Sequence, residues 1–203
     1  MGESGKVFLP HAFRLEEKKS PGPIPVSAEI LGGVAERLKA FIAGSGQINV
    51  FIDRDGKVRR LPLWVRFGQK NYPALGFLAA GRKLGLNIED AAFSGGRVTA
   101  GKLSIPVDER ASLWINFPGT WNTTFKRFSY LDVLKAYVAR EKGEQPWLDL
   151  GVFKDKICFV GLTATGTSDL RANPLEPVYP MVGVQASLCD SVMRSEFISR
   201  ARP

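Results

Sequence analysis

The sequence has few of the residues that build metal and redox sites, with two cysteines and one histidine among 203 residues. Zinc and haem sites in proteins depend on Cys and His ligands, so we expect neither a metal nor a cofactor. Long apolar runs are also missing, since no stretch reaches the roughly 18–20 residues of a membrane span. No signal peptide opens the chain, and residues 1–6 resemble an added start. We therefore expect no membrane-spanning segment within this chain.

A recognisable catalytic set is missing as well. A Ser–His–Asp or Cys–His arrangement would have to use His11, and nothing in the sequence places a nucleophile beside it. Gly161–Ser168 has the glycine spacing of a nucleotide P-loop, but Thr167 stands where that motif requires lysine. Asp53–Gly56 begins like a calcium loop, yet strand-like runs flank it instead of helices. We therefore expect no catalytic site in this chain.

The overall composition is that of an ordinary globular protein, with 44% hydrophobic and 24% charged residues. A length of 203 residues favours a single domain over residues 1–203. The net charge of +8 permits contact with nucleic acid, lipid or acidic ligands without identifying any of them. Basic residues between Arg54 and Lys70 alternate with Phe51, Trp64 and Phe67, as on a nucleic-acid surface. A hairpin with one solvated face has the same composition, and we expect no specific nucleic-acid binding.

Strand-like and helix-like runs alternate along the chain. We expect strands ending at residues 10, 52, 65, 107, 117 and 161, and helices over 28–43, 72–84, 130–140 and 184–197. This alternation predicts the α/β class, with a mixed, partly parallel sheet flanked by helices. The Asp55–Gly56 pair between two strand-like runs adds an antiparallel hairpin, because its tight turn needs residues that tolerate positive φ.

The run from Lys156 to Gly161 is nearly all apolar and predicts a strand that is buried on both faces. Cys158 lies in this run and Cys189 in the last expected helix. The two could pair only if their Cα atoms came within about 7 Å. We expect two buried, unpaired thiols, and the disulfide stays an alternative.

Five short motifs follow one another between Val7 and Ser195, over nearly the whole chain. They are Asn49 with Asp53–Pro62, Tyr72–Gly76, Ile115–Gly119, Phe128–Leu134, and Phe153–Ala164 followed by Asp169, Pro174 and Pro180–Ala186. In this order they resemble the CHASE2 family of extracytoplasmic sensor modules in bacterial receptors. Gln185 and Ser187 depart from the family's frequent histidine and asparagine. The strand–helix segment with which members usually begin is not recognisable here.

The resemblance implies a periplasmic or extracellular input domain, joined to the inner membrane through flanking helices that are absent from this chain. The family's usual outputs are adenylate or guanylate cyclases, histidine or serine/threonine kinases, and diguanylate cyclases. It implies a small-molecule or environmental signal of unknown identity, with a homodimer as a further expectation. The alternative is a Rossmann-like small-molecule enzyme whose active residues escape recognition.

A ligand pocket in an α/β fold lies beyond the carboxyl ends of the strands. This rule points to the loops that follow Asn116 and Gly161. The candidate ligand-binding residues on this basis are Thr163, Thr165, Asp169 and Arg171, with Asp132 as a neighbour. Asp169 has a second interpretation, in which its side chain accepts hydrogen bonds from backbone amides and holds the proline-rich loop in place.

Overall fold

Five strands form the principal sheet of the computed structural model, which describes residues 6–16, 22–164 and 169–199. The strand order is β3-β1-β2-β6-β7. The strands are β1 (Phe8–Leu15), β2 (Val26–Gly32), β3 (Gly44–Gln47), β6 (Trp64–Phe67) and β7 (Lys70–Pro73). The β1–β3 and β2–β6 pairs are parallel, and the β1–β2 and β6–β7 pairs are antiparallel. The fold is therefore α/β with a mixed, partly parallel sheet, as the sequence predicts.

The principal sheet curls until its two edges meet. Gln47 at the end of β3 forms a parallel bridge with Ala74, directly after β7. Aromatic rings from β1 and from the opposite edge fill the inside of the curl, where the Phe13 and Tyr72 rings lie 5.0 Å apart between centroids. Asn49 joins the chain after β3 to the neighbouring strand β1, because its side chain accepts from the Phe13 N–H and donates to the Phe13 carbonyl.

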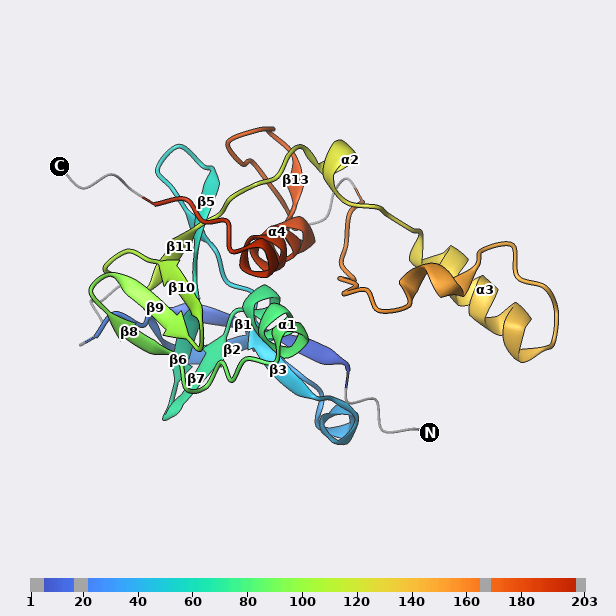
Figure 1. Ribbon diagram of the computed structural model, residues 1–203, viewed down its shortest axis with the longest axis horizontal. Coiled ribbons are helices and arrows are strands. Elements are labelled where there is room, and N and C mark those ends of the chain that lie inside the picture. Colours follow the sequence, from blue (N-terminus) through green and yellow to red (C-terminus); the bar gives the residue numbers. More distant parts are fainter. Residues whose placement is uncertain (1–5, 17–21, 165–168, 200–203) are drawn as a thin grey trace.

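Smaller sheets surround this curled sheet (Figure 1). One contains β8 (Ala92–Ser94), β9 (Arg97–Ala100) and β10 (Leu103–Pro106); a second contains β4 (Phe51–Ile52), β5 (Val58–Pro62) and β11 (Ser112–Trp114); and a third pairs β12 (Leu170–Arg171) with β13 (Tyr179–Pro180). The β4–β5 pair confirms the predicted Asp-Gly hairpin. Gly56 has a φ of +80° there, and its N–H donates to the Asp53 carbonyl.

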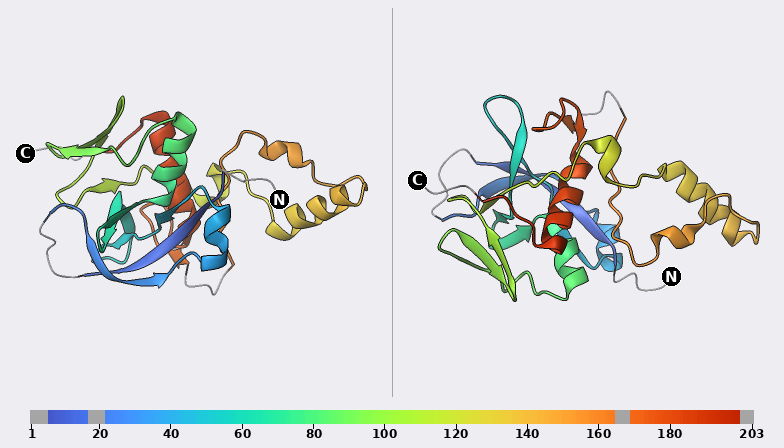
Figure 2. Two further views of the ribbon diagram at one scale, coloured as in Figure 1. Left: turned by 90° about the horizontal axis from the view of Figure 1, so that it is seen from below. Right: turned by 45° about the horizontal axis from the view of Figure 1, so that its top comes forward.

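Helices α1 (Leu75–Leu84) and α4 (Met181–Arg194) pack side by side against the sheets (Figures 1 and 2). They approach closely because Gly76 has no side chain, and a Cβ there would overlap the main-chain oxygen of Gln185. Gln185 Oε1 in turn accepts the Gly76 N–H at 2.9 Å. No side chain of the N-cap residue caps α1, so a residue far away in sequence satisfies an amide at its first turn. Both helices confirm sequence predictions, with starts shifted by about three residues.

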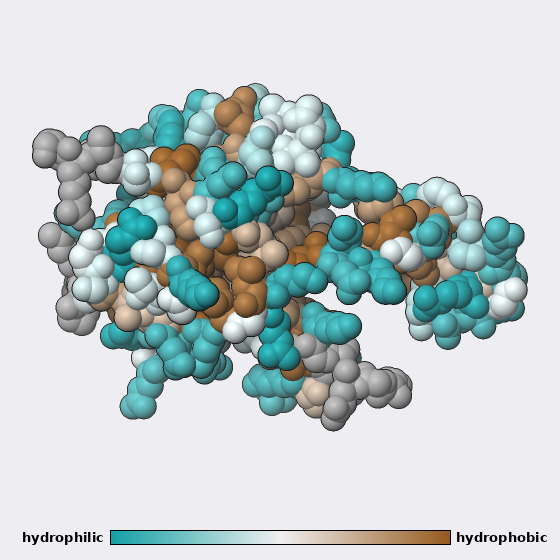
Figure 3. All heavy atoms as spheres, viewed as in Figure 1, coloured by the Kyte–Doolittle hydropathy of each residue, from teal (hydrophilic) through white to brown (hydrophobic). Residues whose placement is uncertain are grey.

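An arm leaves the main body between residues 125 and 156 and carries α3 (Tyr130–Glu141) and the 3-10 helix η2 (Leu150–Phe153). The arm projects away from the sheets in every view (Figures 1 and 2). The Phe128 and Phe153 rings, 4.8 Å apart, hold its two limbs together. Of the α3 residues only Ala136 is buried, so apolar side chains such as Tyr130 and Leu131 remain exposed. Figure 3 shows apolar surface on the arm as well as on the main body.

The predicted helix over residues 28–43 is wrong. This segment forms most of β2 and the short 3-10 helix η1 (Glu36–Phe41), and β3 begins directly after it. The apolar spacing of Ile30, Leu31 and Val34 fits a helix, but Gly32–Gly33 interrupts it, since glycine is unfavourable in a helix interior. The strand pairing of β2 with both β1 and β6 then decides the conformation.

The predicted buried strand over residues 157–160 is also wrong. The segment is extended, but it joins none of the sheets of the described chain. Ile157 and Phe159 pack against the core, whereas Cys158 and Val160 point outward, with Val160 77% exposed. One face of the segment is therefore covered, not two. Cys158 is an exposed thiol and Cys189 a buried one, both unpaired, so burial was predicted correctly only for Cys189.

Candidate functional site

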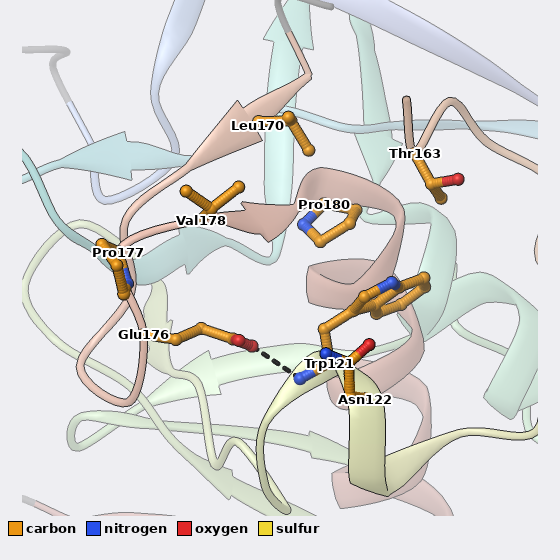
Figure 4. A pocket seen from close by; sticks show the side chains of 8 residues that line it. All are labelled: Trp121, Asn122, Thr163, Leu170, Glu176, Pro177, Val178 and Pro180. Atoms are coloured by element: carbon orange, nitrogen blue, oxygen red, sulfur yellow. Dashed lines mark hydrogen bonds between the residues drawn. The ribbon is translucent and has the colours of Figure 1, made fainter. Parts of the chain in front are cut away.

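A pocket of about 350 Å³ lies where the loops after Asn116 and Gly161 meet the start of α4. Trp121 and Asn122 from α2 (Trp121–Thr124) form one wall, and Thr163 lies on a second (Figure 4). The remaining wall comes from β12, β13 and the loop between them. Its lining residues are Leu170, Glu176, Pro177, Val178 and Pro180.

The loop between β12 and β13 is held in shape from within. Asn173 is fully buried, and its Oδ1 accepts from the N–H groups of Leu175 and Glu176 at 2.8 Å. Glu176 is thereby placed to accept the Trp121 N–H at 2.5 Å, which joins the loop to α2. The dashed line in Figure 4 marks this bond. These contacts connect the wall formed by α2 to the wall formed by β12, β13 and their loop.

The pocket offers an apolar surface with a few polar groups. The Trp121 ring lies edge-on to the Tyr179 ring, with 5.9 Å between the ring centroids. The Arg127 guanidinium lies over the Trp121 ring in a cation–π contact, 5.5 Å from its centroid. Prolines and Val178 continue the apolar wall, while Thr163 and Asn122 supply hydroxyl and amide groups. Mostly apolar walls with a few polar groups that fix orientation are typical of small-molecule sites.

The structure places the predicted site residues in different ways. Thr163 lines the pocket, whereas Thr165 lies outside the described residues. Asp169 is exposed, and its main-chain carbonyl accepts the Met181 N–H. Arg171 is exposed and donates to the Leu170 carbonyl. Asp132 lies on α3 in the arm, and none of these last three residues lines the pocket.

Asn173 holds the loop between β12 and β13, since its Oδ1 accepts the two backbone N–H groups of the loop. Toward the residues that the structure describes, Asp169 bonds through its main-chain carbonyl, and the role suggested for its side chain stays a prediction. Of the lining residues only Thr163 was predicted, and Trp121 and Glu176 are the most important of those that sequence reasoning missed. An Asn-Pro pair three residues before Glu176 is a turn signal that could have pointed to that loop. Nothing local marks Trp121.

Titratable groups elsewhere in the described chain take part in packing and ion pairs. Burial raises the pKa of the Cys189 thiol to about 12, so it is not a ready nucleophile. Arg59 donates to Asp53 and Asp55 at 2.6–2.9 Å, and Arg60 donates to Asp53 and Asp108. Burial raises the pKa of Asp53, but its hydrogen bonds with Arg60 and Arg59 outweigh that and lower it overall. Arg59 and Arg60 of the basic stretch therefore already form ion pairs with carboxylates of this chain.

No group of three or more His, Cys, Asp or Glu side chains that could hold a metal occurs in residues 6–16, 22–164 and 169–199. Over the same ranges, no helix is long and apolar enough to cross a membrane. The mixed, curled principal sheet also differs from the open parallel sheet that a Rossmann-like enzyme domain would have.

The family model described as the CHASE2 domain matches residues 8–203. No curated protein and no solved structure matches the chain.

Proposed function

The chain belongs to the CHASE2 family of extracytoplasmic sensor domains of receptors, and we propose that it is the signal-sensing input domain of a membrane-bound bacterial receptor. In this proposal a small molecule binds the pocket at Trp121, and the receptor controls a cytoplasmic cyclase or kinase. The observation that carries the proposal is that one wall of the pocket continues directly into α4, the last helix of the described chain.

The contacts around the start of α4 provide a path from the pocket to that helix. Pro180 lines the pocket and is the N-cap residue of α4. The neighbouring Tyr179 is fully buried, and its hydroxyl lies 3.3 Å from the Ser187 hydroxyl, two turns into the helix. A ligand that shifts the β13 wall would therefore also shift α4. Only a ligand that binds two arrangements of this region unequally can change their populations.

In this proposal the chain reaches the membrane beyond Ile198, because α4 ends at Arg194 and the residues after it return to the body, where Ile198 bridges Trp114. Arg194 lies in the last turn of α4 and is exposed, paired with Asp190. An arginine there can extend along an apolar surface and contact lipid phosphate. Arg200 and Arg202, which the sequence suggests for the same role, lie outside the described residues. A homodimer would let α4 pass a rotation or shift to the effector.

Insertions between α4 and the membrane test the signalling role in the full-length receptor. One to four residues would be inserted directly after Ser199, beyond the bridge that joins Ile198 to Trp114, and each would rotate a helix that follows by about 100°. We expect effector activity in membranes to change with insertion length. The same insertions between Gly95 and Gly96, in the β8–β9 turn, serve as the control and should leave the output unchanged. Activity that ignores every insertion after Ser199 would leave this domain as a passive spacer and contradict the proposal.

A second variant tests the pocket itself. Thr163→Trp places a large ring in the pocket, whereas Thr99→Trp puts the same ring on the exposed face of β9. If the pocket holds the signal, T163W should alter effector output relative to the wild type, and T99W should not. Identical output from all three receptors would contradict the assignment of this pocket.

A further inference from the structure

A second cavity, of about 540 Å³, opens at one end of the curled principal sheet, away from the pocket at Trp121. Its walls come from both edges of the curl and from the connection that carries η1. The lining residues are His11, Ile30, Gly33, Val34, Lys39, Ile42, Ser45, Lys70 and Tyr72. None of them lines the first pocket.

His11 is the buried polar group of this cavity. It is 9% exposed, and its ring lies 5.1 Å from that of Tyr72 in an edge-on arrangement. Its Nδ1 atom is buried without a hydrogen-bond partner in the described part of the chain. Buried polar atoms nearly always have a partner, so the ring of this cavity-lining histidine keeps a hydrogen-bonding nitrogen that no described residue satisfies.

Gly33 lies directly against this nitrogen. A Cβ at position 33 would lie 2.7 Å from His11 Nδ1 and 3.1 Å from His11 Cε1. The neighbouring Gly32 has nothing within 4 Å of the equivalent position. The two adjacent glycines therefore differ in one respect that an experiment can use, because a side chain at position 33 would crowd His11 and one at position 32 would not.

Two lysines give the cavity a positive potential. Lys70 on β7 and Lys39 on η1 both line it, and both lower the pKa of His11, after the larger effect of burial. Lys39 also pairs with Glu36 at 2.5 Å, and the Lys70 ammonium lies 5.1 Å from the Tyr72 ring. Glu36 does not line the cavity. The charged groups that line the cavity are thus both cationic.

The other wall is apolar, formed by Ile30, Val34 and Ile42. A ligand that fits both walls carries a negative charge at one end and an apolar group at the other. We propose that this cavity binds a small carboxylate with an apolar body, whose carboxylate lies between Lys39 and Lys70 beside His11 and whose body covers Ile30, Val34 and Ile42. This site does not depend on the sensory role proposed above.

Benzoate is a suitable probe, and the single histidine is a built-in reporter. The imidazole resonances of the untagged chain would be followed by NMR at constant ionic strength. The comparison ligands are acetate (charge alone), benzyl alcohol (apolar body alone) and inorganic phosphate. We expect benzoate to shift the His11 resonances in a saturable way and to raise the pKa of His11, because a bound anion favours the imidazolium. The other three should bind at least tenfold more weakly.

Two pairs of variants connect the binding to the cavity. Lys70→Met should weaken benzoate binding by about tenfold or more, the usual effect of losing a charge-assisted hydrogen bond. Lys102→Met, in the β9–β10 turn, is the charge-matched control and should bind as the wild type does. Gly33→Ala should weaken binding in the same way, and Gly32→Ala should not. Circular dichroism and thermal unfolding would show that each variant is folded.

Several results would overturn the proposal. His11 resonances that do not respond to benzoate at millimolar concentration would exclude the site. Equal binding of acetate or phosphate would exclude the apolar body as part of recognition. Equal binding by folded K70M, K102M and wild-type protein would show a non-specific anion effect. Because the readout is binding by the isolated chain, failure here would leave the insertion experiment on signalling unaffected.

Discussion

Gly56 shows how one residue determines a turn. Its φ of +80° lies in the region that β-branched side chains avoid, and nothing lies within 4 Å of the place where its Cβ would be. Any cost of a side chain here therefore arises from the backbone conformation and not from crowding. Arg59, next to the turn, adds ion pairs with Asp53 and Asp55.

Gly56→Val should lower the free energy of unfolding by about 1–2 kcal/mol, the usual cost of forcing a side chain into a left-handed conformation. Urea unfolding followed by circular dichroism would measure it. Gly32→Val is the matched control, because that position is equally open but lacks a positive φ. The control should stay within about 0.5 kcal/mol of the wild type. Equal stability of both variants would count against the turn assignment.

His11 makes the stability of the fold depend on pH. Burial lowers its pKa below the ordinary value of 6.5, and Lys70 and Lys39 lower it further. The unfolded chain therefore binds more protons than the folded chain between the two pKa values. The contribution of neutral His11 is complete above about pH 6.5 and is lost as the pH falls through the folded-state pKa.

His11→Phe should remove this part of the pH dependence, because phenylalanine fills the aromatic cluster without titrating. We expect the wild type to lose more stability than H11F between pH 7 and pH 5, in urea unfolding series at fixed ionic strength. Each protein's value at pH 7 is its own reference, so a general destabilisation by the substitution does not matter. Parallel curves for the two proteins would contradict the prediction.

At the scale of the element, the contact between α1 and α4 depends on close backbone approach. A Cβ on Gly76 would overlap the Gln185 carbonyl, and the Gln185 side chain accepts the Gly76 N–H. Gly76→Ala should therefore destabilise the protein by about 1–3 kcal/mol, as overpacking does. This is opposite to helix propensity, which favours alanine over glycine by about 1 kcal/mol.

Thermal and urea unfolding would measure the effect of G76A. Gly22→Ala provides the control, since that glycine lies in an open loop with nothing within 4 Å. The control should be unchanged or slightly stabilised, because alanine restricts the unfolded chain more than glycine does. A stabilised G76A would mean that α1 and α4 do not approach as closely as the structure has them.

The extended segment 157–160 shows how an element can differ from its pattern. Its residues are apolar on both faces, which predicts burial on both, but pairing with a neighbouring strand needs a partner at the right place. In the described structure the segment packs Ile157 and Phe159 against the core and has no strand beside it. The local sequence pattern predicts a strand, but it does not determine whether the fold places a partner strand beside it.

At the scale of the whole molecule, the arm is the part least supported by packing. Only Ala136 of α3 is buried, and Lys135, Arg140 and Lys142 are exposed. Segments with few buried contacts open at low cost and are cut first by proteases. The body, by contrast, joins residues from both sides of the arm, since Leu188 and Val192 of α4 belong to the same core as Phe77 of α1.

Brief trypsin treatment should therefore cut first between residues 126 and 156. We expect the two fragments to remain associated and to elute together in gel filtration, because α4 stays packed on α1. Mass spectrometry would identify the cuts. Arg97 in β9, whose guanidinium is held by Ser104, serves as an internal comparison and should be cut later. First cuts in the body, or fragments that separate at once, would contradict this view of the arm.

The features that sequence alone determined are those set by neighbouring residues. The Asp55–Gly56 turn follows from glycine's tolerance of positive φ. Helix α1 ends where Gly85 takes a φ of +67°, and α3 begins after Ser129, each at the residue that the sequence indicates. The α/β class follows from alternating patterns, and the order of five motifs indicates the family whose model spans residues 8–203.

The features that only the tertiary structure decided depend on contacts between distant residues. The β2 segment has helical spacing but pairs with β1 and β6, and segment 157–160 has a strand pattern but no partner strand. Trp121 becomes part of a pocket only because Glu176 accepts its N–H across 55 residues of sequence. His11 becomes buried, with no partner for its Nδ1 among the described residues, because the sheet curls until Tyr72 reaches it. The free energy of the whole fold decides which strands pair and how the sheet closes, and a local sequence pattern does not determine that free energy.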